Sequence, residues 1–265
     1  MDSDHWDPDL YERFAAERTR PFDELLGLLE PSPGGHVVDL GCGTGALTRR
    51  LHEHLGAGTT VGVDNSPAML ARAAEQPGFG LTFSAGDLAE PSLGTRGGPF
   101  DVVHSNAALH WVEDHPGLLP RLAALLAPGG QLAFQVPANH EHPSQTVAAE
   151  VAAEEPFAAA LDGYQRRSPV LEPEAYALAL HDLGLTDLTV SARVYLHLLP
   201  SPTAVVDWVR GTTLTDYQRR LPEDVFGAFL ARYAAALTNR LPRDGAGRVA
   251  FTFRRILVHG RLPAA

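Results

Sequence analysis

A glycine-rich loop near the start of the chain restricts the fold more than any other feature. Residues 41–45 carry glycine at every second position, and they lie between an apolar run at 36–40 and a helical stretch at 46–55. Such a loop allows a tight turn and a close approach of a ligand to the backbone, and the following helix offers free N–H groups. The context predicts a strand, a ligand-binding loop and a helix, which begin a βαβ unit.

Strands and helices continue to alternate after this loop. We expect a second strand at 59–64, then a helix from Pro67 to about residue 76 with Ser66 as its N-cap. Further strands are expected at 80–84, 100–105 and 131–136, a helix at 118–126, and strand-like runs at 188–198 and 248–258. This order predicts an α/β fold with a doubly wound, Rossmann-like and mostly parallel sheet.

The chain is expected to form a single domain, residues 1–265. Its 45% hydrophobic content is enough for a full core, and α/β folds of this length often form one unit. Two helical blocks are expected to cap the carboxyl edge of the sheet, where ligands of open α/β sheets bind. The expected parts are a core of about 30–138 completed by strands near 186–198 and 248–259, a helical cap of about 139–184 and 201–241, and an N-terminal helical lid at 1–30.

Charge and composition narrow the classes of function. A formal net charge of −11 opposes binding to nucleic acid phosphates, and no apolar run is long enough to span a membrane. The single cysteine, Cys42, forms neither an intramolecular disulfide nor a cysteine-rich metal site. His52 and His54 are two residues apart on a predicted helix, and His140 and His142 share that spacing, so no metal site is expected. The expectation is a cytoplasmic monomer or homodimer with no metal, nucleic acid or membrane partner.

Acidic residues at the ends of the first three strands indicate which ligand the loop binds. Asp39 comes two residues before the first glycine, where a carboxylate opposes a pyrophosphate but favours the ammonium and sulfonium groups of S-adenosylmethionine (SAM). Asp64 ends the second strand, where it can accept hydrogen bonds from two ribose hydroxyls, and Asp87 can accept one from the adenine amino group. The sequence therefore predicts SAM rather than a nicotinamide dinucleotide.

The expected cofactor-binding residues follow the ends of the first four strands. They are Asp39, Gly41, Cys42, Gly43, Gly45, Asp64, Asn65, Ser66, Met69, Gly86, Asp87, Leu88, Ser105, Asn106 and Ala107. Cys42 is interpreted as a small residue that fits the loop and not as a nucleophile, because methyl transfer from SAM needs no covalent enzyme intermediate.

Longer motifs resemble those of one known family. They include Trp6-Asp7-Pro8, 38–43, 64–69, 105–111, 125–130, 206–209 and 229–233, and so run almost end to end. The chain resembles class I SAM-dependent methyltransferases and, within them, the trans-aconitate 2-methyltransferases. The resemblance implies a seven-stranded sheet with a helical cap, and methyl transfer to a carboxylate of a small polycarboxylic acid, giving a monomethyl ester. Where the family has Gly-Leu-Arg-Pro in the cap, this chain has residues 213–216, with Thr215 in place of the arginine and Asp216 beside it.

A carboxylate acceptor sets its own requirements for the site. It is already ionised at neutral pH, so no general base is expected, and positioning does the catalytic work. An anionic substrate approaching a chain of net charge −11 needs local cations and hydroxyl donors. The substrate-positioning candidates are His110, Trp111, Arg18, Arg20, Arg193, Arg210, Tyr195, His197 and Tyr217.

Several alternatives remain open at this stage. His110 and Trp111 fit simple packing nearly as well, and Trp6 and Tyr11 fit a hydrophobic staple of the first helix. A second function is O-methylation of a hydroxyl or phenol, with His110, His140 or His197 as the base. A third is a SAM-binding protein without catalysis, which would bind SAM and turn over no acid.

Overall fold

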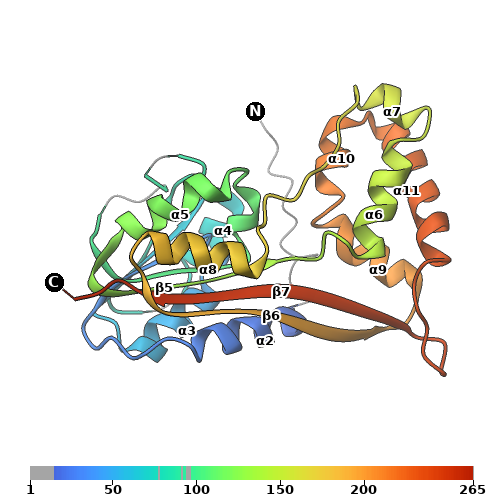
Figure 1. The fold of residues 1–265 in the computed structure, drawn as a ribbon. Helices are drawn as coiled ribbons and strands as arrows, with labels where there is room; N and C mark the ends of the chain where they lie inside the picture. The colour runs from blue at the N-terminus through green and yellow to red at the C-terminus, as the bar shows by residue number, and fades with distance from the viewer. Residues whose placement is uncertain (1–14, 77, 91, 94–96, 265) are drawn as a thin grey trace.

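A seven-stranded sheet forms the centre of the computed structural model, which describes residues 15–264 except 77, 91 and 94–96 (Figure 1). Its order is β3-β2-β1-β4-β5-β7-β6. The strands are β1 (His36–Leu40), β2 (Thr59–Asp64), β3 (Leu81–Ala85), β4 (Phe100–Asn106), β5 (Leu126–Pro137), β6 (Thr186–Leu199) and β7 (Val249–Arg261). β1 to β5 are parallel, and β7 runs antiparallel to both β5 and β6. The predicted doubly wound, mostly parallel α/β sheet is confirmed.

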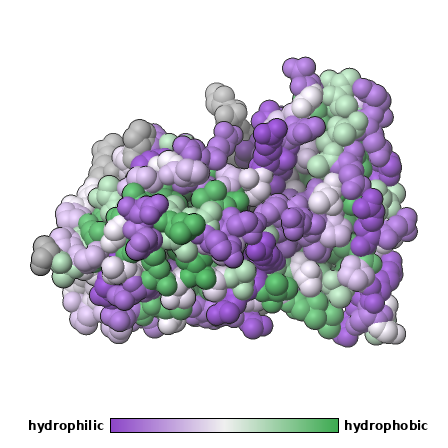
Figure 2. Space-filling model, in the orientation of Figure 1, coloured by the Kyte–Doolittle hydropathy of each residue, from purple (hydrophilic) through white to green (hydrophobic). Residues whose placement is uncertain are grey.

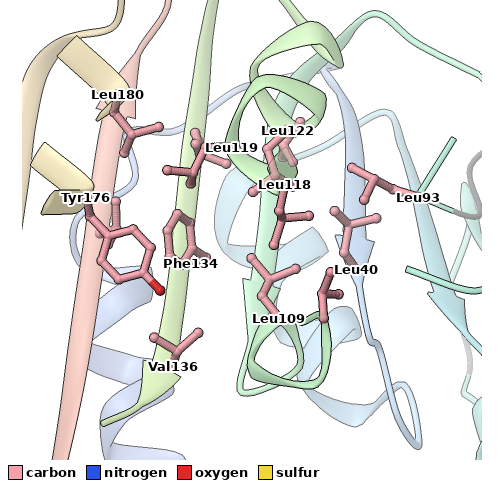
Figure 3. Close-up of a cluster of buried hydrophobic side chains, with 14 of the residues drawn as sticks. Leu40, Leu93, Leu109, Leu118, Leu119, Leu122, Phe134, Val136, Tyr176 and Leu180 are labelled. Atoms are coloured by element: carbon pink, nitrogen blue, oxygen red, sulfur yellow. The ribbon is translucent and has the colours of Figure 1, made fainter. Parts of the chain in front are cut away.

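Helices cover both faces of this sheet. On one face, α2 (Ala15–Leu26) and α3 (Ala46–Leu55) bury leucines against β1, β4, β5 and β7. On the other face, α5 (His115–Ala124) and α8 (Pro173–Asp182) pack on β1, β4, β5 and β7. Figure 3 shows this second layer, with Leu119 of α5 and Tyr176 of α8 beside Phe134. These two layers fix the strand ends that position the site.

Further helices form a cap at one end of the sheet (Figure 1). They are α6 (Pro143–Ala152), α7 (Phe157–Ala160), α9 (Pro202–Arg210), α10 (Thr215–Arg220) and α11 (Glu223–Thr238). Their apolar core includes Trp208, Phe229 and Tyr233, together with Leu199 of β6 and Phe251 of β7. β6 and β7 have 14 and 13 residues against 5 in β1, and their extra length carries the chain from the sheet into the cap.

Only the first half of the segment 139–184, which was expected to belong to the cap, lies in the cap. α8 lies within that segment, yet Tyr176 and Leu180 are fully buried among the sheet residues and not among those of the cap. The reason is the hydrophobic face of α8, which covers β6 and the antiparallel end of the sheet. In the structure, the cap helices of this segment are α6 and α7 alone.

Local start signals explain where two helices begin. Ser66 accepts a hydrogen bond from the Met69 N–H at 3.3 Å, so it is the N-cap of α4 (Pro67–Ala73), as predicted. α5 begins at His115 and not at 118, because Asp114 accepts from the Gly117 N–H at 3.0 Å and Pro116 occupies the first turn. The strand expected at 131–136 begins already at Leu126. None of the helices in the described part of the chain is long and apolar enough to cross a membrane.

Candidate functional site

The glycine loop between β1 and α3 is held close to the end of β2. The backbone N–H groups of Gly41 and Cys42 both donate to the Val63 carbonyl, at 2.7 and 3.0 Å. Gly41 has φ 79°, and a Cβ there would lie 2.1 Å from the Cβ of Ala108. Gly43 has φ 55°, and a Cβ there would meet nothing within 4 Å. The first glycine is therefore required by packing, whereas the second borders open space.

Asp64 joins the loop to the turn after β2. One carboxylate oxygen accepts from the Gly43 N–H and the other from the Ser66 N–H, each at 2.9 Å. Burial raises the pKa of Asp64 above the ordinary carboxyl value, and these backbone donors oppose that rise. Each oxygen keeps a further lone pair, so the group can still accept from two hydroxyls of a ribose.

Asp39 lies beneath the loop and is almost completely buried. Its carboxylate accepts from the Thr48 hydroxyl at 2.5 Å and pairs with Nδ1 of His104 at 2.8 Å. Each of its two oxygens therefore has one partner within the protein. The carboxylate also places a negative charge under the loop, which favours a cationic ligand.

The other expected cofactor residues differ in exposure. Asp87 is exposed after β3 and accepts from the Ala89 N–H at 2.8 Å, whereas Leu88 packs against the core. Gly86 donates to the Asp64 carbonyl at 3.0 Å, which ties this turn to the end of β2. Near the end of β2, Met69 is buried in α4 and Asn65 is exposed. The structure thus brings the turns after β1, β2 and β3 to one edge of the sheet.

Cys42 is buried within the loop. Burial, with the nearby charges of Asp39 and Asp64, raises the pKa of its thiol far above the ordinary value. A thiol that stays protonated is a poor nucleophile. The structure therefore supports its interpretation as a loop residue.

A line of polar side chains leads from β4 across the sheet to β7. Asn106 accepts at Oδ1 from Nε2 of Gln135 at 2.7 Å, and Gln135 accepts at Oε1 from Nη1 of Arg255 at 3.0 Å. Ser105, before Asn106, donates its hydroxyl to the Leu40 carbonyl at 2.7 Å. Ala107 follows with φ 54°, and it turns the chain into a neighbouring cavity.

This cavity lies between the carboxyl edge of the sheet and the cap. Its lining consists of Ala107, His110, Trp111, Pro137, Asn139, His140, Gln145, Arg166, Ser168, Pro169, Val170, Trp208, Thr212, Thr213, Phe253 and Arg255. Figure 2 shows hydrophilic side chains along the boundary between the sheet half and the cap half of the molecule. Among the described residues the lining includes two arginines and no aspartate or glutamate, although the whole chain carries a net charge of −11.

Arg166 comes from the segment between α7 and α8. Its Nε donates to Asp216 at 3.0 Å and its Nη1 to Gln145 at 3.2 Å. Gln145 in turn donates to the Thr213 hydroxyl at 2.5 Å. Asp216, the acid beside the missing family arginine, therefore anchors another arginine, while Thr215 donates its hydroxyl to the Thr212 carbonyl at 2.5 Å.

Arg255 reaches the cavity from the sheet side. It pairs with Pro137 in the register of β5 and β7, is 5% exposed, and lies 4.9 Å from the centre of the Phe253 ring. Sequence reasoning missed both arginines. Neither has a local signal: Arg166 lies in an irregular segment, and Arg255 lies in a run that indicates only a strand.

His110 lines the cavity together with both arginines. Its Nδ1 is buried without a hydrogen-bond partner among the described residues. Burial, followed by the charges of Arg166 and Arg255, lowers the pKa of its ring to about 3. The imidazole is therefore neutral at physiological pH and is a weak base.

Three predicted substrate-positioning residues gather elsewhere. Arg20 pairs with Glu24 at 3.0 Å, Arg193 pairs with the same carboxylate at 3.6 Å, and Tyr195 donates to it at 3.0 Å. None of the three lines the cavity. The side chain of Arg18 lies outside the described part of the structure, as do Trp6 and Tyr11.

The other candidates belong to the cap. The ring of His197 lies 5.0 Å from that of Trp208, and Arg210 is exposed at the end of α9. Tyr217 is 1% exposed, and burial raises its pKa to about 12. Among the predicted substrate residues whose side chains the structure describes, His110 and Trp111 line the cavity. No group of three or more histidines, cysteines or acids that could hold a metal occurs among the described residues.

Comparison with known proteins agrees with this arrangement. A family model described as "Methyltransferase domain" matches residues 11–190. A trans-aconitate 2-methyltransferase of Deinococcus radiodurans is 42% identical over 95% of this chain and 96% of its own length, and one of Klebsiella pneumoniae is 39% identical over 97% of each. The YcgJ protein of Bacillus subtilis has the same fold, with a TM-score of 0.61 over 93% of this chain and all of its own, at 15% identity.

The fold and the glycine loop define a class I methyltransferase. Within that class, the chain belongs to the family of the trans-aconitate 2-methyltransferases, which confirms the resemblance stated from the sequence.

Proposed function

We propose that the protein transfers the methyl group of SAM to a carboxylate of a small polycarboxylic acid, with trans-aconitate as the first candidate, to give a monomethyl ester. The observation that carries the proposal is the lining of the cavity next to Ala107, which holds Arg166 and Arg255 and no acidic residue among those described. The names of the relatives support the same acceptor.

The residues at the ends of β1 to β4 fit SAM. The open space beside Gly43 leaves room for the ligand, and Asp64 keeps lone pairs for ribose hydroxyls. The exposed carboxylate of Asp87 is free of burial and can accept from an adenine amino group. SAM supplies an electrophilic methyl group on a sulfonium. Asn106 ends β4, and Ala107, the next residue, lines the acceptor cavity.

The acceptor carboxylate needs orientation and not activation. It is ionised at neutral pH, so a general base has no proton to remove. Arg255 and Arg166 offer charge-assisted hydrogen bonds that hold carboxylates, and Trp111 and Trp208 provide apolar walls that exclude water. The rate enhancement then comes from alignment of the carboxylate oxygen with the methyl group.

The hydroxyl or phenol alternative requires a base. His110 is neutral but has a pKa of about 3, which makes it a poor proton acceptor. His140 is the better candidate, because it lines the cavity and its Nε2 lies 3.5 Å from Glu172. Because His140 and Glu172 could act as a base, O-methylation of a hydroxyl or phenol stays an alternative. A pH–rate profile tests it.

The proposal is tested by incubating the protein with SAM and trans-aconitate, and measuring S-adenosylhomocysteine together with the mass of the product. We expect release of S-adenosylhomocysteine and a product heavier by one methylene unit, sensitive to esterase. Turnover of a phenol and of no acid would replace the proposal by the hydroxyl alternative. SAM binding without turnover of acids or phenols would favour the protein without catalysis.

A further inference from the structure

We propose that Arg166 binds a carboxylate of the acceptor that does not react, and that Asp216 and Gln145 position its guanidinium for this purpose. The inference rests on the proposed function and deepens it. It assigns the preference for acids with two or more carboxylates to a side chain of the cap, and it makes Arg166 the residue that determines specificity.

The anchoring of Arg166 leaves part of its guanidinium available to a ligand. A guanidinium carries five N–H donors in a planar fork. Asp216 and Gln145 each accept one of them, and Arg166 makes no other hydrogen bond to the described residues. Because the two anchors come from α10 and α6, they fix the plane of the fork before a substrate arrives. Such preorganisation lowers the entropic cost of binding.

The surroundings of Arg166 strengthen its interaction with an anion. Its side chain is 20% exposed, and that of Asp216 is 25% exposed. Asp216 does not line the cavity, so its carboxylate compensates the charge of Arg166 from behind and does not face the substrate. Partial removal from water makes a charge-assisted hydrogen bond stronger than on the open surface.

Two cationic walls face one cavity. Arg255 lies on the sheet side, next to Gln135 and the end of β5, while Arg166 lies on the cap side. His110 lines the same cavity, and the charges of both arginines help to lower the pKa of its ring. An acceptor with one carboxylate can contact one of the two arginines at a time. An acceptor with two or three carboxylates can satisfy both.

The test is Arg166→Gln, with Arg167→Gln as its matched control. Arg167 is adjacent in sequence, exposed and outside the cavity lining, so its loss removes the same charge without the proposed contact. Binding of trans-aconitate, glutaconate and crotonate, which carry three, two and one carboxylates, is measured by calorimetry on protein saturated with S-adenosylhomocysteine. Steady-state kcat and KM are measured for the acids that turn over.

We expect Arg166→Gln to raise the Kd and KM for trans-aconitate and glutaconate by about 10- to 100-fold, since a lost charge-assisted hydrogen bond has this effect. The Kd for crotonate and for S-adenosylhomocysteine should change less than about threefold. Arg167→Gln should match the unmodified protein. Arg166→Lys keeps the charge but not the fork, so it should recover part of the affinity.

Asp216→Asn separates positioning from a purely structural role. It keeps the side chain's size and one acceptor oxygen but removes the charge behind Arg166, so we expect a smaller rise in KM for the same two acids and an unchanged Kd for crotonate. An equal loss of affinity for all three acids in Arg166→Gln, together with a lowered melting temperature, would overturn the proposal. It would show that Arg166 only stabilises the fold. Unchanged binding of trans-aconitate would overturn it as well.

The result also distinguishes this inference from the proposed function. Binding of trans-aconitate that depends on Arg166 but leads to no methyl transfer would reject trans-aconitate as the substrate and retain the site. Methyl transfer to trans-aconitate that is indifferent to Arg166 would retain the function and reject the site.

Discussion

The two halves of the proposed active site are built in different ways. The cofactor half uses short turns at the ends of successive strands, and its key contacts involve backbone groups, as where Asp64 accepts from Gly43 and Ser66. The acceptor half combines side chains from distant segments, such as Trp111, Gln145, Arg166 and Arg255. The comparison teaches that one half depends on local backbone geometry and the other on how the cap is placed against the sheet.

The largest effect is expected at the backbone of the cofactor half. Gly41→Ala combines a positive φ with a Cβ 2.1 Å from Ala108, so it should lower the free energy of unfolding by about 3 kcal/mol and abolish measurable SAM binding. Chemical denaturation and calorimetry check both quantities.

Gly43→Ala is the matched control for Gly41→Ala. A methyl group there meets no protein atom within 4 Å, so it should cost only about 1–2 kcal/mol of backbone strain while still weakening SAM binding. Equal loss of stability in both variants would contradict the description of open space beside Gly43.

A smaller effect is expected from the charge of Asp64. Asp64→Asn places an amide N–H₂ against the N–H of Gly43 or Ser66, because only one acceptor oxygen is left for the two donors. We therefore expect the Kd for SAM to rise by about 10- to 100-fold, or about 1.5–3 kcal/mol. The KM for the acceptor acid should stay within about threefold. A change in acceptor KM equal to that in SAM affinity would show that the two halves are not separable.

The acceptor half should show little response to pH. Because burial and two arginines hold the pKa of His110 near 3, this ring does not titrate between pH 5.5 and pH 8. With an acid whose carboxylate is ionised throughout that range, kcat/KM should stay within about twofold. A rise with an apparent pKa of 6–7 would indicate a catalytic base, with His140 as the first residue to substitute.

The smallest expected effect is on the pH dependence of stability, through His142 at the start of α6. Burial lowers the pKa of His142 to about 4, so its neutral form is favoured in the folded protein. The unfolded chain takes up the proton near pH 6.5, and the contribution of His142 to stability is therefore complete above pH 6.5 and lost as the pH falls towards 4. His142→Asn keeps a side-chain acceptor for the Ser144 N–H. We expect its melting temperature to fall less between pH 7 and pH 5 than that of the unmodified protein, and an identical fall would contradict this role.

The contrast between the two halves also explains what the sequence could predict. The 41–45 loop, Asp64 and the Ser66 cap are local patterns, and the structure has the expected strand, turn and helix around each. Arg20 and Arg193 were candidates for the acceptor half because of their charge, yet both pair with Glu24. Charge alone does not say which side chains meet across the fold.

Packing decided the remaining differences. Arg166 could not be identified from sequence because its partners Gln145 and Asp216 are 21 and 50 residues away. Thr48 and His104 hold Asp39 beneath the loop, and His104 reaches it from another strand, a contact that no local pattern indicates. The register of β1 and β4 brings Asp39 and His104 together.

The most direct test of the central claim is a comparison of kcat/KM at pH 7 for trans-aconitate, crotonate and a simple phenol, with S-adenosylhomocysteine as the readout. The cationic cavity predicts rapid turnover of trans-aconitate to a monomethyl ester, at least tenfold weaker turnover of crotonate, and none of the phenol. Turnover of the phenol with none of either acid would contradict it.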